Sequence, residues 1–399
     1  MPGRSQTPSP TGSGNKQKSR DGGFSLAHGL LNKKYLREPI VSCPLPDLSG
    51  TSLRGLQRVS LTDCQKEGKV LRTKRISLYI LSQAAKLLTL LIAISILSFM
   101  LVSYSPIDPI RAYIGGDMLR VSPEQRANIE EYWGLNEPRV SQYLNWANSI
   151  LHGDLGTSLL YRSPVAQVIA ERFVASLALM AIAWLLSGIF GFILGIIAGM
   201  KKGTWIDRLI KGYCYVLSAT PTFWLGLVVV IVFSVWLGWF PIGLGTPAGI
   251  LEQDVSLTDY LRHLFLPALT LSIIGVANIA LHTRTKLVET LNSEFIWFAK
   301  AKGEKGLKLL WRHGLRNISL PAISLQFASF GELFGGAVLT EQVFSYPGLG
   351  QAIVEAGLGG DVPLLLGIVL FSTIFVYVGN LMADILYKVI DPRIRKEWN

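Results

Sequence analysis

Hydrophobic residues gather in six long runs along the chain after residue 76, and shorter polar segments separate the runs. A helix needs about 20 residues to cross a hydrocarbon layer of about 30 Å, and each run is at least that long. A membrane strand would need only about half that length and would alternate polar with apolar residues, so the runs predict helices. The six predicted spans are residues 77–104, 171–199, 210–238, 264–283, 318–340 and 363–387.

The basic residues predict how these spans are oriented, because Lys and Arg concentrate in cytoplasmic segments. Four segments on one side of the spans carry 30 of the 38 Lys and Arg, whereas the three on the other side carry 6. The richer segments are residues 1–76, 200–212, 284–317 and 388–399. The pattern therefore predicts an all-α membrane protein with six transmembrane helices and both termini in the cytoplasm.

Two spans carry further detail. Gly191, Gly195 and Gly199 recur every four residues in the second span and form a small-residue face, which suits close helix contact either within the bundle or with a second subunit. Pro221 interrupts the third span, where proline is tolerated and often produces a kink.

The segments outside the spans differ in character. Residues 1–75 are rich in Ser, Gly, Pro, Lys and Arg without a sustained period, so we expect a poorly ordered cytoplasmic extension, either a genuine appendage or the product of a start placed too far upstream. Residues 76–399 form the membrane domain. Within it, residues 105–165 form a helical insertion on the opposite side, with a helix start at Ser122-Pro123-Glu124 and turn chemistry at 153–156.

Composition narrows the function. Half of the 399 residues are hydrophobic and 16% are charged, which is too apolar for a soluble domain of this size. The net charge of +11 does not indicate nucleic-acid binding, because the basic residues flank apolar runs. Neither Gly-x-x-x-x-Gly-Lys-Ser/Thr nor a metal-ligand spacing of Cys and His occurs, so we expect no catalytic residue, cofactor or metal site in this chain.

The polar segment 294–321 has an internal order. Phe295, Phe298, Ala299 and Lys302 share one side of a helix, and Gly303 permits a bend. A second helical piece follows, so we expect a short helix, a sharp turn and a helix across the membrane surface, which would fit a groove on a partner. Its apolar positions are Leu307, Leu310, Trp311 and Leu315. The alternative is an ordinary solvated interfacial loop.

This order of residues resembles the coupling loop of permease subunits of ATP-binding-cassette importers, in the dipeptide, oligopeptide and nickel branch. The matching positions are Glu294, Ala299, Ala301, Gly303, His313, Arg316, Asn317 and Pro321. The outer turn Pro347-Gly348-x-Gly350, preceded by Glu341 and Phe344, is also similar to that family, as are Gln142-Tyr143-x-x-Trp146, Asn380-Leu-x-x-Asp384 and Asp361-x-Pro363.

The resemblance implies a bacterial inner-membrane complex. Its expected partners are membrane lipid, a second homologous permease subunit, two ATP-binding subunits that hold ATP and Mg, and an extracytoplasmic substrate-binding protein. Residues 105–165 would be a structural cap over the outer mouth, a docking surface for that binding protein, or both. The segment 294–321 would dock on the ATP-binding subunits. The cargo would be a dipeptide, an oligopeptide, glutathione, nickel or a metal chelate, and the residues do not decide among them.

Glu332 departs from the family pattern, which has a small apolar residue at this place near the middle of the predicted fifth span. An acid at that depth costs roughly 2.5 kcal/mol or more, so it tends to face a protein interior or a watered path. We predict a path lined by Glu332, Asn278, Glu341 and Phe344 that attracts a cationic group. The alternative is that Glu332 only packs, hydrogen-bonded to Asn278 or Ser329.

Two rival classes stay open at this stage. An autonomous secondary transporter or channel would show ion-coupling acids, broken helices at matching places in two inverted halves, and no docking loop. A membrane scaffold would carry no cargo.

Overall fold

The computed structural model describes residues 61–104, 122, 124, 136–247, 249 and 254–390, and these residues are almost entirely helical. The helices are α1 (Leu61–Ser103), α4 (Arg139–Leu151), α5 (Val165–Met200), α6 (Trp205–Ser218), α7 (Thr222–Val229), the π-helix η2 (Val230–Trp236), α8 (Leu257–Leu291), α9 (Glu294–Ala301), α10 (Gly306–Leu309), the π-helix η4 (Leu310–Gly314), α11 (Leu315–Ala328), α12 (Phe330–Phe344), α13 (Leu349–Gly359) and α14 (Val362–Ile390). The pairing of Thr157 with Pro164 is the one isolated β-bridge in this part of the chain.

Four helices of the described chain are each long and apolar enough to cross a membrane, and two bent helix pairs raise the number to as many as six. The four are Ser77–Ser103, Val165–Met200, Leu257–Leu291 and Val362–Leu386. They coincide with the first, second, fourth and sixth predicted spans. The prediction of an all-α membrane protein is confirmed in this coarse form.

The third predicted span is not one kinked helix. α6 and the continuous pair α7 and η2 meet at an angle of 109°. Pro221 has the extended values φ −62° and ψ 137° and directly precedes α7. A proline donates no backbone hydrogen bond and disfavours helical geometry in the residue before it, so Thr220-Pro221 ends one helix and starts another.

The fifth predicted span also differs from expectation. Helix continues without a break from Gly306 through η4 and α11 to Ala328, and a bend of 52° then leads into α12. Leu320-Pro321 stands near residue 318, where the sequence placed the start of this span, but it lies inside a helix that began earlier. Pro321 lacks the N–H that would bond the Asn317 carbonyl, and membrane helices tolerate such a gap when the freed group finds another partner.

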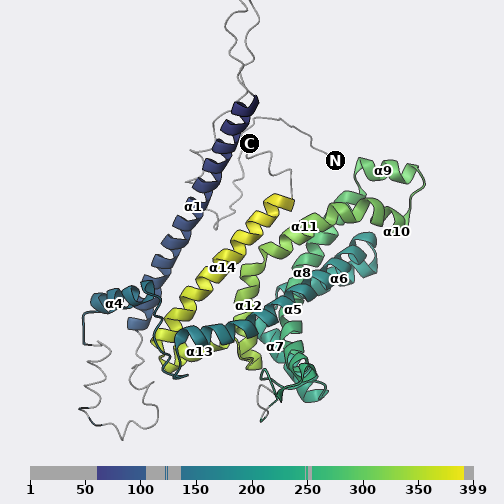
Figure 1. Cartoon of the computed structure of the whole chain (residues 1–399). Helices are drawn as coiled ribbons and strands as arrows, with labels where there is room; N and C mark the ends of the chain where they lie inside the picture. Colours follow the sequence, from purple (N-terminus) through teal and green to yellow (C-terminus); the bar gives the residue numbers. More distant parts are fainter. Residues whose placement is uncertain are drawn as a thin grey trace, which may run out of the picture. The chain divides into compact units, whose positions relative to one another are not determined.

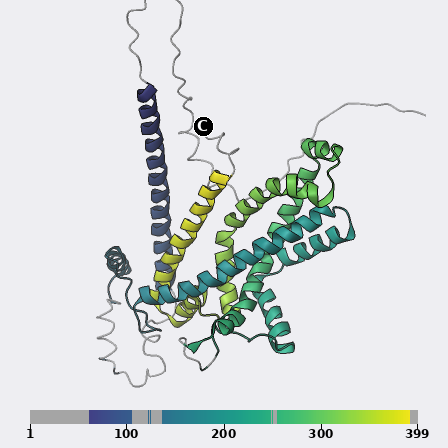
Figure 2. The same ribbon diagram turned by 45° about the vertical axis from the view of Figure 1, so that its right-hand side comes forward.

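α1 is bound to the rest of the described chain mainly along α14. The two helices run beside each other in both views (Figures 1 and 2), and the Tyr377 hydroxyl of α14 donates to the Gln83 carbonyl at 2.9 Å. α1 begins at Leu61, inside the segment expected to lack regular structure, because extending an existing helix costs far less than nucleating one. Residues 1–60 lie outside the described residues. So does most of the segment around the predicted helix start at 122–124.

α4 explains one of the family-like motifs. Tyr143 and Trp146 lie on one face of α4 and pack on Phe99 of α1, with ring centroids 5.3 and 6.2 Å from that ring. The Tyr143 hydroxyl is also 2.9 Å from the Ser95 hydroxyl. Gln142-Tyr143-x-x-Trp146 therefore anchors the insertion to the first span.

The most extensive helix contact among the described residues joins α5 to α8, along Gly191, Gly195 and Gly199, which we call the glycine seam. A Cβ at Gly195 would lie 2.6 Å from the Thr283 Cβ and 2.7 Å from the Ala280 carbonyl oxygen. The small-residue face thus packs within this chain, one of the two alternatives that the sequence left open.

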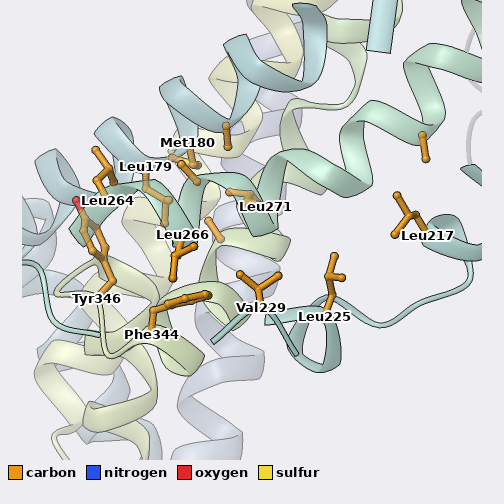
Figure 3. Close-up of a cluster of buried hydrophobic side chains, with 14 of the residues drawn as sticks. Leu179, Met180, Leu217, Leu225, Val229, Leu264, Leu266, Leu271, Phe344 and Tyr346 are labelled. Carbon is orange, nitrogen blue, oxygen red and sulfur yellow. The ribbon is translucent and has the colours of Figure 1, made fainter. Parts of the chain in front are cut away.

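Beside the seam lies the main apolar core, shown in Figure 3. Leu179 and Met180 of α5 meet Leu264, Leu266 and Leu271 of α8 and the ring of Phe344 at the end of α12. Tyr346 follows Phe344 into this core and is fully buried, with its hydroxyl 3.0 Å from that of Tyr260.

Two buried carboxylates join segments at the end of the fold that carries α13. Asp361 accepts from the Leu364 N–H in the first turn of α14, and also from the Ser158 hydroxyl at 2.5 Å and the Leu160 N–H at 3.0 Å. Glu341 accepts from the Ser176 hydroxyl and the Gly350 N–H, both at 2.6 Å. The two acids thus hold together the segments around residues 158–160, 176, 341–350 and 361–364.

We expect Gly195→Ala to lower the thermal unfolding midpoint of the purified protein, because the added methyl group forces α5 and α8 apart at a cost of about 1–3 kcal/mol. Gly212→Ala is the matched control, since Gly212 lies in helix α6 and a methyl group added there would meet nothing within 4 Å. It should leave the midpoint unchanged or raise it slightly. Equal midpoints for the two variants would contradict the seam.

Candidate functional site

The segment 294–321 begins with the short amphipathic helix α9. Ser293 precedes its first turn, where Glu294 lies beside the positive end of the helix dipole. Ile296 and Ala299 are buried and pack on Leu309 of α10 and on Leu291 at the end of α8. The side chain of Lys300 donates to the Leu291 carbonyl at 3.4 Å. α9 is thereby fixed to both helices that flank it.

Gly303 makes the bend that the sequence predicts. Its φ is +89°, in the left-handed region that favours glycine. The Gly303 N–H donates to the Lys300 carbonyl, and the Glu304 N–H donates to the Ala299 carbonyl, so α9 ends in a Schellman motif. A Cβ at Gly303 would meet nothing within 4 Å, so backbone conformation, and not crowding, requires a glycine here.

Glu304 holds the bend against the helix that follows. Its two carboxylate oxygens accept from the Arg312 guanidinium at 3.0 Å and from the His313 imidazole at 2.9 Å. The Asn317 side chain in turn donates to the His313 carbonyl at 2.8 Å. Sequence reasoning singled out His313 and Asn317 but missed Glu304, although it is the single acid in a basic stretch.

Five large apolar side chains between residues 295 and 311 are exposed. This aromatic face consists of Phe295, Trp297, Phe298, Leu307 and Trp311, and their exposed fractions run from 48 to 73%. The Lys302 ammonium lies 4.5 Å from the centre of the Phe298 ring. Phe295 and Phe298 were expected on the side of Ala299, but the structure directs Ala299 into the core with Ile296 and leaves both rings exposed.

The second helical piece is not a separate helix, because it continues from α10 through η4 into α11. Leu310 and Ile318 pack with Leu287 of α8 in a small buried cluster. Arg316 and Ala301 are exposed, and Pro321 is half-buried within α11. The aromatic face is therefore joined to α8 on one side and to α11 on the other by buried contacts.

A second polar anchor, also missed from the sequence, lies nearby on α8. The Arg284 guanidinium donates two hydrogen bonds, of 3.0 and 2.8 Å, to the buried carboxylate of Asp207 at the start of α6. Asp207 also accepts from the Gly203 N–H at 2.9 Å, which closes the turn between α5 and α6. In the sequence, the only signal for Asp207 as an anchor is its place in the polar segment after the second span, in the first turn of a helix.

The structure divides the four predicted path residues into two pairs. Glu332 and Asn278 are exposed on α12 and α8, and Glu332 lies in the first turn of α12, directly after the 52° bend. Ser329, an expected partner of Glu332, donates its hydroxyl to the Gln326 carbonyl. Glu341 and Phe344 are 1% and 2% exposed, so they line no open path in this conformation.

The outer turn has a packing explanation. Pro347 and Gly348 connect α12 to α13, and Gly350 lies in the first turn of α13. A Cβ at Gly348 would collide with the carboxylate of Glu341, and one at Gly350 would lie 2.9 Å from it. The glycines leave room for the buried acid.

Within the described residues, no three His, Cys, Asp or Glu side chains are grouped so that they could hold a metal ion.

Known proteins match most of the chain. The family described as "Binding-protein-dependent transport system inner membrane component" matches residues 191–396, and its N-terminal counterpart matches residues 77–180. The oligopeptide transport system permease protein AppB of Bacillus subtilis (strain 168) is 35% identical over 317 residues, which cover 79% of this chain and 98% of that protein. The di/tripeptide transport system permease protein DppB of Pseudomonas aeruginosa (strain UCBPP-PA14) is 34% identical, with 79% and 99% covered.

We expect Glu304→Ala to speed hydrogen exchange of the amides between residues 303 and 309, because the variant frees the bend from Arg312 and His313. Ion pairs at such partly exposed sites contribute at most about 1 kcal/mol, so global unfolding should change little. Glu289→Ala is the control, since Glu289 forms an exposed ion pair with Lys286 on α8. Hydrogen-exchange mass spectrometry should show faster exchange at 303–309 only in the Glu304→Ala variant. Unchanged exchange there would show that Glu304 does not hold the bend.

Proposed function

The chain belongs to the family of binding-protein-dependent transport system inner membrane components, and we propose that it is the translocating permease subunit of an ATP-binding-cassette importer for peptides. It is a multi-pass protein of the bacterial inner membrane. Peptides are the proposed cargo because the curated relatives described above are named for oligopeptides and for di- and tripeptides. Nickel or a metal chelate stays a possible cargo only through the sequence resemblance.

The observation that carries this proposal is the aromatic face on a rigidly held helix pair. This much exposed apolar surface would be unfavourable in water. Aromatic residues beside basic ones are also typical of protein interfaces. The occupant we propose is one of two ATP-binding subunits, which hold ATP and Mg. A second, homologous permease and an extracytoplasmic binding protein complete the importer.

The proposed mechanism follows from how the face is attached. α9 packs through Ile296 on Leu291 and Leu309, and the next helix packs through Leu310 and Ile318 on Leu287. A displacement of the face by ATP-driven closure of the partner subunits would therefore move α8 and α11 together. The break at Pro221 and the bend after Ala328 are the places where the spans could change direction during alternating access.

The orientation is part of the same proposal. Segment 294–321 and the turn between α5 and α6 would face the cytoplasm with both termini, and α13 would face outward with the 105–165 insertion. The excess of Lys and Arg on the first side supports this arrangement.

The rival, an autonomous transporter, predicts broken helices at matching places in two inverted halves. The described chain does contain two bent spans, the third and the fifth. In an inverted repeat of three spans each, the third would correspond to the sixth and the fifth to the second. α14 and α5 are continuous helices, so the breaks do not match.

The decisive experiment is purification of the tagged full-length chain from its native membrane. We expect an ATPase subunit to co-purify, and ATP hydrolysis by the complex in lipid vesicles to rise when a loaded peptide-binding protein is added. Purification without an ATPase, with peptide uptake that follows an ion gradient instead of ATP, would establish the rival.

We predict that Gly303→Val abolishes ATP-dependent uptake while the protein stays at its normal level in the membrane, because a β-branched residue strongly disfavours a φ of +89° and distorts the bend. Gly238→Val is the control and should keep uptake. Gly238 also has a positive φ, +63°, and open space around it, but it follows η2 and belongs neither to the aromatic face nor to a polar anchor. Gly303→Asn should retain partial uptake because Asn tolerates left-handed backbone. Normal uptake by Gly303→Val would contradict the coupling role.

We predict that Glu332→Gln reduces uptake of cationic peptides more than uptake of neutral or acidic ones, because it removes the exposed charge and keeps the shape. Protein level should not change, and Glu332→Ala should also be inserted normally, since a small residue suits this position. Uptake of three peptides that differ only in charge would measure the effect. An equal change for all three would leave Glu332 with a packing role.

A further inference from the structure

A narrow apolar groove runs between α1, α12 and α14, apart from the segment and the path residues described above. α14 forms its floor, Leu90 and Ile94 of α1 form one wall, and Phe334 and Val338 of α12 form the other. Its volume is about 420 Å³. Residues at the start of α13 line the end near the outer turn. No charged side chain lines the groove.

We propose that this groove binds one acyl chain of a membrane phospholipid, which fills the space between α1 and the rest of the bundle. The lining of α14 extends from Ile368 to Asn380, or about 18 Å at the rise of an α-helix. That is close to the thickness of one hydrocarbon leaflet, about 15 Å.

The size of the groove selects among occupants. Its volume is about 420 Å³, whereas a helix about 10 Å across with its side chains would fill roughly 1,400 Å³ over a length of about 18 Å. Carbon atoms in contact lie about 3.5–4.0 Å apart, so one hydrocarbon chain fits. A helix of a partner subunit, about 10 Å across with its side chains, does not fit.

The polarity of the lining also favours a hydrocarbon. Two of its hydroxyls are already bonded within the protein, that of Thr373 to the Val369 carbonyl and that of Tyr377 to Gln83. A peptide would bring amide groups and charged termini that need hydrogen-bond partners, and the remaining lining supplies few. The exposed amide of Asn380 lies at the opposite end from α13, where a glycerol or headgroup oxygen could accept from it.

The consequence for the fold concerns α1. In the described chain this helix packs mainly on α14, and only a small share of its membrane-spanning residues is buried. A bound acyl chain would cover Leu90 and Ile94 and contact Phe334 and Val338 at the same time. The lipid would thus act as a structural ligand that links the first span to the fifth.

The test uses the full-length chain, with whatever subunits co-purify, in vesicles of phosphatidylethanolamine and phosphatidylglycerol that contain a phosphatidylethanolamine with a diazirine in one acyl chain. After illumination, peptide mapping should show labelling enriched at residues 90–94, 334–338 and 368–380 over other lipid-exposed surfaces. Val376→Phe should reduce this labelling to the level of the exposed helix faces, because the ring occupies the groove.

Val378→Phe is the matched control, since Val378 is two residues away on α14, is 42% exposed and does not line the groove. It should leave the labelling unchanged. Ser372→Leu fills the groove with a smaller group and decides the question if Val376→Phe fails to fold. Uniform labelling of all lipid-facing helices, labelling that survives both filling variants, or displacement of the lipid label by a peptide cargo would overturn the proposal.

Discussion

The close approach of α5 and α8 along the glycine seam is the contact on which the other elements depend. Lipid hydrocarbon is as apolar as the side chains, so helices in a membrane associate through close packing and not through burial from water. Gly191, Gly195 and Gly199 allow the α8 side chains Ile279, Thr283 and Leu287 to approach the α5 backbone. From this pair, α8 carries the aromatic face at one end, and α5 carries Ser176 toward the other.

Polar anchors sit toward both ends of the α5 and α8 pair. The Asp207–Arg284 pair joins α6 to α8 near the aromatic face, while Glu341 and Asp361 join α5, α12, α13, α14 and the loop before α5. Removing one partner of such a buried group is costly, since the other is left without a hydrogen bond. Each anchor therefore specifies one arrangement of its helices, whereas the apolar contacts between them could slide. This division suits a protein whose ends must keep their shape while its spans reorient.

One of the two irregular places in the spans carries an acid. Pro221 separates α6 from α7, and the bend after Ala328 brings Glu332 to the start of α12. An acid is more stable there than within a continuous helix, because the free N–H groups of the first turn favour negative charge. The groove beside α1 is a different kind of irregularity. It is a packing gap between α1 and α12, both of which contact α14. Lipid is an available solvent at that position, so the gap need not be empty.

The sequence by itself determined the class of the fold, the positions of six apolar runs and the bend at Gly303, because these depend on hydrophobic length and on local backbone preference. It also predicted the short helix that opens the segment 294–321. It could not determine that Leu320-Pro321 lies inside a helix, that Ala299 turns inward while Phe298 stays exposed, or that Glu304 holds the bend. It also could not assign the glycine seam to α8, or join Asp361 to Ser158 and Asp207 to Arg284. The seam and the two buried carboxylate anchors depend on surfaces that meet across more than 70 residues of chain, and the choice among equally apolar partners is made by side-chain shape and hydrogen-bond geometry in the folded bundle. The contacts of Ala299 and Glu304 span about ten residues or fewer, but they also form only once α9 packs against the helices beside it.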